Sequence, residues 1–564
     1  MKLTKLILFL TCIMLAFSGC EPETITPDGG KTEQPGQTPG TDEGGDKEPG
    51  DGTEGDGTEG DGNEGDGNEG DGNEGDGNEG DGNEGDGNEG DGNEGDGNDD
   101  DIPTFNDGNV PTAGYPAGAF TTADVDHDGI RYMWDESFIP EITIHITADE
   151  WNKLLKRYDE FSHNVDYFHA DFTYKRGDEE IFIEDGGIRL RGNTSRRRPE
   201  GNGGQMHNSQ NPDWHHCHFG INFRKFHKDD AHTVKGIRKV NLKWFKDDPC
   251  YVREVYCYNL FRRYGIWTSA FSTFCRVWLE VKKKKKKAYL GVYNMIEPID
   301  DKFVEKRVEG KFESDKGFLW KCVYGPDGPA DLNGTDSRKF NWDQDNGVNY
   351  TYEFKGDEED FAAAKEQLED FILKLKGKGE DSFYKWINEV CDVNFLLKTY
   401  AVNVAVGMWD DHWNNGNNFY LYFNTTDKYA YKVYFLPYDY DNSLGTSSNC
   451  GVISDSGRQD PYNWGDNGLL MERLMRFSDF KLAYKNALLE LTDPAKDLFD
   501  MESSVSRIKL WQQNIAPYVS NDTGEDMKIE DKPASWGNHG EYRLMDTGSN
   551  NFFRVKTETI KKMK

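Results

Sequence analysis

The chain lacks several patterns by which common functional classes are recognised. Beyond residue 20 it has no apolar run long enough to span a bilayer, so no transmembrane helix is expected there. It contains no CxxC or HExxH motif, and we therefore expect no structural zinc site. A Gly-x-Ser-x-Gly elbow is also missing, which leaves a serine hydrolase with little support.

Cysteine is sparse, with nine residues in a chain of 564. Cys12 and Cys20 fall in the N-terminal segment, so seven remain, and an odd number cannot be fully paired within one chain. Cys250 and Cys257 lie seven positions apart at one predicted helix, a spacing that suits packing better than a disulfide.

Residues 1–20 have the pattern of an export signal. Lys2 and Lys5 precede an apolar run from Leu6 to Phe17, and Ser18-Gly19-Cys20 follows. The apolar core is too short for a membrane span. The ending resembles a bacterial lipoprotein signal, which predicts a lipid on Cys20, the membrane as a partner, and a cell-envelope location that includes the cell surface. The alternative is ordinary secretion with cleavage nearby.

Residues 21–110 are predicted to be a disordered acidic linker. From Asp51 the sequence is DGTEG twice, DGNEG seven times and then DGNDD. The nine repeats contain two acids each and the last unit contains three, which gives 21 negative charges. The net charge of the whole chain is −37. Because the array has no apolar side chain, it cannot offset the entropy of ordering. We therefore expect an extended tether that holds a nearly neutral domain away from a membrane.

The linker end, residues 111–135, contains a spacing typical of a calcium loop. Asp124, Asp126 and Asp128 alternate before Gly129, and Asp135 takes the twelfth position. No amphipathic helix precedes the string. The alternative is that these carboxylates are the polar end of the linker.

The body from residue 136 to 564 has ordinary globular composition and enough length for two lobes. Strands are predicted at 141–147, 167–174, 181–184, 188–190, 274–281, 288–296 and 318–323. Helices are predicted after a capping box at Thr147–Glu150, over 252–264 with one apolar face, and over 361–375 and 395–408. From Leu469 on, the pattern predicts further helices.

An arginine-rich turn follows the strand at 188–190. Arg191, Gly192 and Asn193 lie in residues 189–198, where five arginines fall within ten residues. Guanidinium groups match phosphate oxygens, and a Gly-Asn turn presents backbone N–H groups to an anion. This predicts a phosphate clamp at Arg191 and Asn193. A solvated basic loop is the alternative.

The densest chemistry lies between residues 409 and 442. Asp410, Asp411, Asn417 and Asn418 precede two aromatic runs, 419–424 and 429–436, separated by a polar turn. An antiparallel hairpin returns the chain to its start, so these residues should meet the segment that carries Asp439 and Asp441. Clustered oxygen ligands suit a hard cation such as Mg²⁺ or Mn²⁺. The alternative is that the polar residues only make turns and caps.

Protein kinases show a similar order, with a catalytic Asp and a metal-binding Asn before a second metal-binding Asp. The HRD and DFG signatures are absent here. Lys321 lies among apolar residues of a strand and needs a partner if buried, and Glu297 is an available one. The alternative places Lys321 on the solvent face of its strand.

Several of these segments together resemble the CotH family of atypical, protein-kinase-like enzymes. They are Pro140–Ile144 with Glu150–Asn152, Gly187–Ser195, Gly291–Asp300, Asp411–Tyr422 and Leu436–Asp441. The resemblance implies an α+β, divergent two-lobed protein-kinase-like fold that uses ATP and Mg²⁺ to phosphorylate Ser or Thr of a protein substrate. No nucleic-acid partner is expected.

The resemblance also implies roles for individual residues. Asp411 is the expected catalytic residue, with Asp410 as its alternative. The expected metal ligands are Asn417, Asn418, Asp439 and Asp441, and Lys321 and Glu297 are expected on the nucleotide side. Two other functions stay open at this point: a catalytically weak surface adhesion or scaffold module, and a metal-dependent phosphoryl or nucleotidyl transferase with another acceptor.

Overall fold

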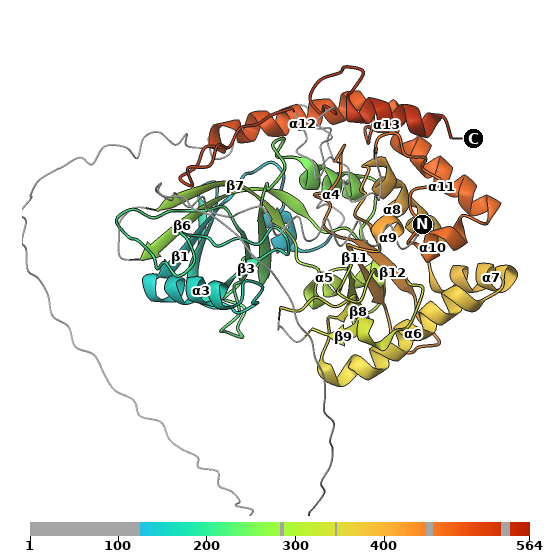
Figure 1. The fold of residues 1–564 in the computed structure, drawn as a ribbon, viewed down its shortest axis with the longest axis horizontal. Coiled ribbons are helices and arrows are strands. Elements are labelled where there is room, and N and C mark those ends of the chain that lie inside the picture. Colours follow the sequence, from blue (N-terminus) through green and yellow to red (C-terminus); the bar gives the residue numbers. More distant parts are fainter. Residues whose placement is uncertain (1–124, 283–286, 344–346, 447–454, 532–541, 564) are drawn as a thin grey trace, which may run out of the picture. The chain divides into compact units, whose positions relative to one another are not determined.

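A seven-stranded barrel forms the first part of the body in the computed structural model, which describes residues 125–282, 287–343, 347–446, 455–531 and 542–563 (Figure 1). The predicted signal, lipidation site and repeats lie outside the described residues. The barrel strands are β1 (Glu141–Thr147), β2 (Phe168–Arg176), β3 (Glu179–Arg191), β4 (His218–Asn222), β5 (Lys239–Trp244), β6 (Ser272–Lys282) and β7 (Ala288–Ile296).

The barrel closes in the order β1-β2-β3-β4-β5-β7-β6. All of its neighbouring strands are antiparallel except β1 and β6, which pair in parallel from Glu141 opposite Arg276. Alternating side chains such as Ile142, Ile144 and Ile146 fill the interior. Helix α3 (Ala148–Glu160) follows β1, and Thr147 caps it by accepting from the Glu150 amide at 3.1 Å, as the capping box predicts.

A second sheet and a layer of helices form the rest of the body. The sheet has the order β12-β11-β8-β10-β9. Its strands are β8 (Phe318–Cys322), β9 (Phe340–Trp342), β10 (Tyr352–Phe354), β11 (Phe419–Phe423) and β12 (Val433–Pro437). The fold is therefore mixed α+β, as expected from the sequence. The barrel itself was not predicted.

The described helices of this second part surround a large apolar cluster. They are α6 (Phe361–Gly377), α7 (Glu380–Val390), α8 (Val393–Ala405), α9 (His412–Asn415), α10 (Leu469–Leu474), α11 (Ser478–Leu491), α12 (Met501–Ile515) and α13 (Phe552–Lys561). Figure 1 shows α12 and α13 on one side of this layer and α6 and α7 on another. Two short helices, α2 (Asp128–Met133) and α5 (Asp301–Glu305), flank the barrel segments.

Helix α4 (Arg253–Arg263) connects the two parts. The sequence predicts one apolar face, but residues 253–262 are all buried, including Arg253 and Glu254. The one-face prediction is wrong because the helix packs against β6 on one side and α8 on another. A charged residue on such a helix must find a partner in the interior.

Two predicted strands, 181–184 and 188–190, are one continuous strand. β3 runs from Glu179 to Arg191 and pairs with β2 across an irregular step between Ala170 and Phe172. Asp185 lies at this step with φ of 51°, a left-handed conformation that Asp tolerates better than most residues. The sequence predicted a break between the two strands at residues 185–187, whereas the structure has a bulge there.

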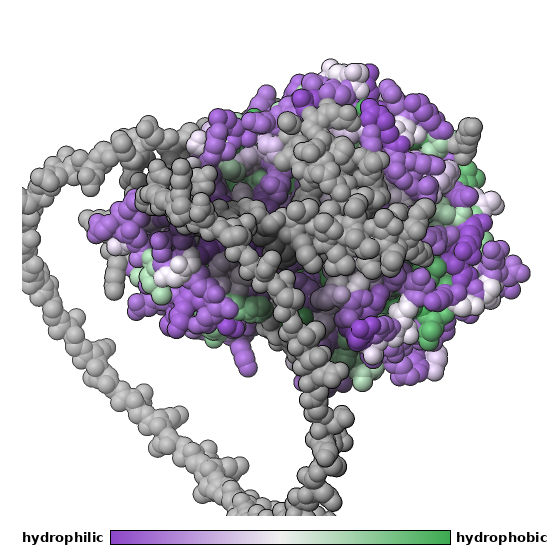
Figure 2. All heavy atoms as spheres, viewed as in Figure 1, coloured by the Kyte–Doolittle hydropathy of each residue, from purple (hydrophilic) through white to green (hydrophobic). Residues whose placement is uncertain are grey.

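The visible surface of the body is mainly hydrophilic, with isolated hydrophobic residues (Figure 2). Exposed large apolar side chains such as Phe182, Leu373 and Tyr429 come from different elements. Single exposed apolar residues are usual for folded proteins. Within the described ranges, no helix combines the length and the apolar character that crossing a membrane requires.

Candidate active site

The hairpin of β11 and β12 brings together the two polar segments that the sequence singled out. Phe419 pairs with Pro437 at one end and Phe423 with Val433 at the other. The residues before Phe419 and after Pro437 therefore lie at the same end of the sheet, as predicted. Asn418 and Asp439 both adopt left-handed backbone conformations, with φ of 58° and 60°.

The centre of the site is Lys243 of β5. Its ammonium lies 2.6 Å from Asp439, 3.3 Å from Asp441 and 2.9 Å from Glu254 of α4. The lysine side chain is 14% exposed and the glutamate 6%. One cation therefore joins a barrel strand, a buried helix and the segment after β12.

The charges of this cluster depend on one another. Burial raises the pKa of Asp439, but the neighbouring cations, Lys243 foremost with Arg191 and Lys321, outweigh it and hold that pKa below the ordinary value. Burial raises the pKa of Asp441 to about 8, although Lys243 opposes the shift. Burial would lower the pKa of Lys243, yet its carboxylate partners raise it well above the usual range. Lys243 therefore stays protonated, and Asp439 is the carboxylate of this cluster whose pKa lies below its ordinary value.

Asp410 lies in a ring of amides next to this cluster. Its Oδ1 accepts from the side chains of Asn415 at 2.6 Å and Asn417 at 2.9 Å, and its Oδ2 accepts from Asn418 at 3.2 Å. Burial raises the pKa of Asp410, and the neighbouring Asp439 charge adds to the effect. A carboxylate that is fixed by three amides and has a raised pKa suits a general base.

Asp411 faces the interior instead. It is 4% exposed, and its Oδ1 caps α9 by accepting from the Asn414 amide at 2.9 Å. Its Oδ2 accepts from Asn403 of α8, which in turn accepts from the Tyr440 hydroxyl at 2.8 Å. Burial raises the pKa of Asp411 to about 7. These contacts make Asp411 a buried helix cap.

The two adjacent asparagines differ in what they leave for a metal ion. The Asn417 amide donates to Asp410 and its Oδ1 accepts from the Tyr324 backbone at 2.8 Å, so both ends are used. Asn418 donates through its amide nitrogen to Asp410. Within the described part of the chain, its Oδ1 has no hydrogen bond, so Asn418 is the better supplier of an oxygen ligand.

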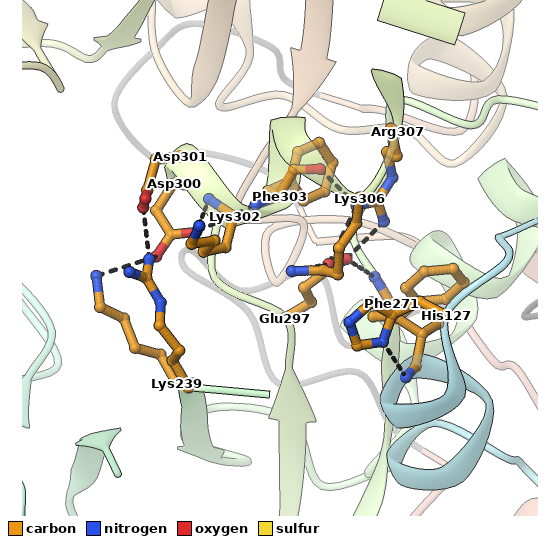
Figure 3. Close-up of polar contacts among 12 residues, drawn as sticks. His127, Lys239, Phe271, Glu297, Asp300, Asp301, Lys302, Phe303, Lys306 and Arg307 are labelled. Atoms are coloured by element: carbon orange, nitrogen blue, oxygen red, sulfur yellow. Dashed lines mark hydrogen bonds and ion pairs between the residues drawn. The ribbon is translucent and has the colours of Figure 1, made fainter. Parts of the chain in front are cut away.

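Glu297 has a different partner from the one predicted. Its carboxylate forms a two-pronged pair with Arg307, at 2.6 and 3.1 Å, and Lys306 approaches to 3.6 Å (Figure 3). Arg307 is fully buried, and the Phe271 amide also donates to Glu297. The predicted pairing with Lys321 is therefore wrong, because a buried arginine already satisfies this carboxylate.

Lys321 lies on β8 between two neighbouring strands. It is opposite Tyr420 on β11 and Glu353 on β10, and its side chain is half-buried. Its charge contributes to lowering the Asp439 pKa, so it lies on the site's side of the sheet. A nucleotide-binding role for Lys321 and Glu297 stays a prediction, and the lysine–glutamate pair of this site is Lys243 with Glu254.

The arginine-rich turn contributes one residue to the site. The Arg191 guanidinium donates to the Tyr438 hydroxyl at 3.3 Å, next to Asp439. Three other arginines of the turn are occupied elsewhere: Arg196 donates to backbone carbonyls, Arg197 pairs with Glu525 and Arg198 pairs with Asp159. Asn193 is exposed. Anion binding by Arg191 stays a prediction, and the wider clamp has no support from the other three arginines.

The carboxylates of the calcium pattern face arginines. Asp126 and Asp128 pair with Arg131 at 2.9 and 2.7 Å, and Asp128 begins α2. Asp135 pairs with Arg176 of β2 at 2.5 Å. Asp124 lies outside the described residues. The described carboxylates do not converge, and calcium binding stays a prediction without structural support.

Sequence reasoning missed Lys243 and Glu254. On β5, Lys243 alternates with the buried Val240 and Leu242, which is the usual pattern of an outward-facing residue. The available signal was Glu254, an acid that directly precedes the apolar and aromatic run Val255–Tyr258. The miss follows from β5 itself, which was not among the predicted strands, so no strand was expected at Lys243.

Comparison with known families identifies one match. The family model described as CotH kinase protein matches residues 188–548, which is more than half of the chain and includes every member of the site described above. A search of curated proteins finds no match.

Proposed function

The chain belongs to the CotH kinase protein family, and from this we propose that it transfers the γ-phosphate of ATP to a Ser or Thr hydroxyl of a protein. The observation that carries the proposal is the Lys243 cluster, in which a buried Lys–Glu pair meets two aspartates that follow a hairpin. Protein kinases use the same combination of a strand lysine, a helix glutamate and a metal-binding Asp.

The donor set fits a divalent metal ion. Asp439 and Asp441 offer carboxylate oxygens and Asn418 offers an amide oxygen, the ligand types that Mg²⁺ and Mn²⁺ prefer. When bound, such an ion neutralises charge that develops on transferred phosphate oxygens. The fit includes Lys243, whose ammonium can turn from Asp441, the weaker partner at 3.3 Å, toward an added phosphate.

Each residue then has a distinct task. Glu254 holds the Lys243 ammonium, and Asn294 fixes Glu254 by donating to it at 3.2 Å. Asp410 accepts the proton of the acceptor hydroxyl, while Asn415, Asn417 and Asn418 fix its orientation. Arg191 binds an anionic oxygen beside Asp439. Asp411 stabilises the loop as the N-cap of α9.

One observation favours a binding or scaffold module instead. Lys243 already neutralises Asp439 and Asp441 without any ligand, so the cluster is complete as a structural element. In that case the protein keeps the fold and its ion pairs but turns over no nucleotide.

The decisive experiment is label transfer by the full chain from ATP carrying label in the γ- or the α-phosphate, with Mg²⁺ or Mn²⁺. Asp410→Asn and Asp439→Asn are the test variants, and Asp392→Asn, an exposed helix cap, is the control. If the wild type transfers the γ-label and both test variants do so at least 100-fold more slowly, the result supports a kinase. Transfer of α-label identifies a nucleotidyl transferase, and folded protein that neither binds nor turns over nucleotide supports the scaffold function.

The N-terminal sequence supports a second proposal, that the protein is exported and held at a membrane by a lipid on Cys20. The supporting evidence is the charged, apolar and small-residue order that ends in Cys20. Incorporation of a labelled fatty acid that Cys20→Ser abolishes is the expected result. Equal incorporation by the variant contradicts the proposal.

A further inference from the structure

A group of metal-binding side chains lies on the barrel, in the loop between β4 and β5. His227, Asp229 and His232 each offer one ligand atom, and these atoms lie within 4.8 Å of one another. The two imidazole rings stack with centroids 3.9 Å apart and planes inclined by 4°. Within the described ranges no other three His, Cys, Asp or Glu residues meet this criterion.

The donor set selects a class of metal. Two imidazoles and one carboxylate are the ligands of Zn²⁺ and related first-row transition ions, whereas Mg²⁺ and Ca²⁺ prefer oxygen alone. Around Zn²⁺, ligand atoms at about 2.1 Å lie about 3.4 Å from one another. Side-chain movements on the order of 1 Å bring the three atoms into this arrangement. Three protein ligands leave one position open for water or for an external ligand.

A second layer holds the first histidine in place. Asp185, at the bulge of β3, accepts from His227 Nε2 at 2.9 Å and from His169 Nδ1 at 2.5 Å. Within the described part of the chain, His227 Nδ1 has no hydrogen bond, so this nitrogen remains for a metal. A carboxylate on the far nitrogen fixes the tautomer and orientation of a ligating imidazole.

The backbone around Asp185 also helps to position its carboxylate. Asp185 takes a left-handed φ of 51°, and its amide donates to Asp171 at 3.0 Å. Phe226 stacks on His169 with ring centroids 3.6 Å apart, which holds the loop against β2 and β3. The strained residue and the stacked ring together place a carboxylate where it reaches two histidines.

We propose that His227, Asp229 and His232 bind a Zn²⁺-class transition-metal ion, with Asp185 as the residue that positions His227. The site lies in the loop before β5 and is separate from the Lys243 cluster, since the four residue steps of β5 from Lys239 to Lys243 span on the order of 13 Å. It requires no catalytic activity and stands if the proposed kinase function fails.

The test is Co²⁺ titration of the chelator-treated full chain, followed by visible absorption and by competition with Zn²⁺. The background is Asp439→Asn, which removes a ligand of the metal site proposed at the Lys243 cluster. We expect one equivalent of Co²⁺ to bind and to show the intense visible absorption of a low-coordinate site that has nitrogen ligands. The acidic repeats offer oxygen only, so ions bound there absorb weakly.

Matched variants distinguish this site from other histidines. His227→Ala and His232→Ala should each weaken binding at least tenfold, and Asp185→Asn should weaken it 10- to 100-fold. His163→Ala, which removes a histidine outside the group, should leave binding unchanged. Should His227→Ala fail to fold, His232→Gln serves in its place. The proposal is overturned if the wild type binds no Co²⁺ with nitrogen ligands. It is also overturned if all of these variants bind that Co²⁺ as tightly as the wild type does.

Discussion

Asp410 and Asp411 are adjacent in sequence but face different surroundings. Asp410 is held by amides at the edge of the Lys243 cluster, and Asp411 is buried as the cap of α9. The sequence offered both as the catalytic residue and preferred Asp411. The contacts favour Asp410, because it is only half-buried, whereas Asp411 is 4% exposed and both of its oxygens are bonded within the interior.

Removal of the Asp411 carboxylate tests its capping role. We expect Asp411→Ala to lower the free energy of unfolding by about 2–4 kcal/mol, because it removes a helix cap and leaves the buried Asn403 amide unpaired. Urea denaturation measures the loss. Asp392→Ala, at an exposed cap of α8, should cost only about 1 kcal/mol. Equal losses at the two caps would contradict the buried role.

The raised pKa of Asp411 adds a pH dependence of known sign. The native carboxyl keeps its proton up to about pH 7, whereas an unfolded Asp loses it near pH 4. Folding therefore binds a proton in this window, and Asp411 contributes less stability as the pH rises from about 4 to 7. Asp411→Asn does not titrate, so its stability relative to the wild type should increase over this range. A constant difference in unfolding free energy between pH 5 and 8 would exclude the effect.

At the scale of elements, Lys243 links three pieces of the chain. It lies on β5, its partner Glu254 lies on α4, and Asp439 and Asp441 follow β12. No other cation replaces it in the described contacts of Glu254. One ammonium group therefore bridges the barrel, the helix and the segment that follows the hairpin.

Lys243→Met should destabilise the protein by about 3–5 kcal/mol, because the buried Glu254 and two half-buried aspartates then lose their common cation. Lys239→Met is the control on the same strand, since Lys239 pairs with Asp300 at the half-exposed end. Thermal unfolding at neutral pH compares the two variants. A Lys243→Met protein as stable as the Lys239→Met protein would show that the cluster does not join these elements.

The pairing of β8 with β11 positions the hairpin, and Gly317 permits it. A Cβ at Gly317 would lie 1.7 Å from the carbonyl oxygen of Phe423. Gly317→Ala should therefore lower the free energy of unfolding by about 3 kcal/mol. Gly334→Ala adds a Cβ that meets nothing within 4 Å and should change stability by less than about 0.5 kcal/mol. Similar denaturation midpoints for both variants would contradict the close approach.

The two kinds of element differ in how well the sequence predicts them. The β11–β12 hairpin follows from two aromatic runs and a polar turn, and its register is local. The closure of β1 on β6 joins residues more than 130 positions apart, and no local pattern specifies it. Lys243 and Glu254, 11 positions apart, become partners on β5 and α4, and β5 was not predicted. The Asp and Asn residues of the hairpin ends were predictable from the hairpin alone.

At the scale of the whole molecule, a segment near the C-terminus runs back to the barrel. The Asp522 amide donates to the Tyr289 carbonyl of β7 at 2.8 Å, and its side chain accepts from the Tyr289 amide at 3.0 Å. Glu525 pairs with Arg197 and with the buried His216. The segment after α12 thus contacts both β7 and the residues that lead into β4.

Glu525 gives this contact a pH signature. Burial would raise its pKa, but His216 and Arg197 outweigh burial and lower that pKa to about 2. An unfolded Glu binds its proton near pH 4.5, so Glu525 stabilises the fold fully above that pH and loses the contribution as the pH falls toward 2.

Glu525→Gln should therefore cost about 1–3 kcal/mol at pH 7, because charged hydrogen bonds become neutral ones. At pH 3 the cost should be smaller, since the wild type has lost part of the same stabilisation. Unfolding free energies at the two pH values give both numbers. Glu502→Gln, at an exposed position of α12, is the control and should change stability by less than about 0.5 kcal/mol at either pH. A Glu525→Gln cost that stays the same at both pH values would mean that packing, and not the ion pairs, holds this segment to the barrel.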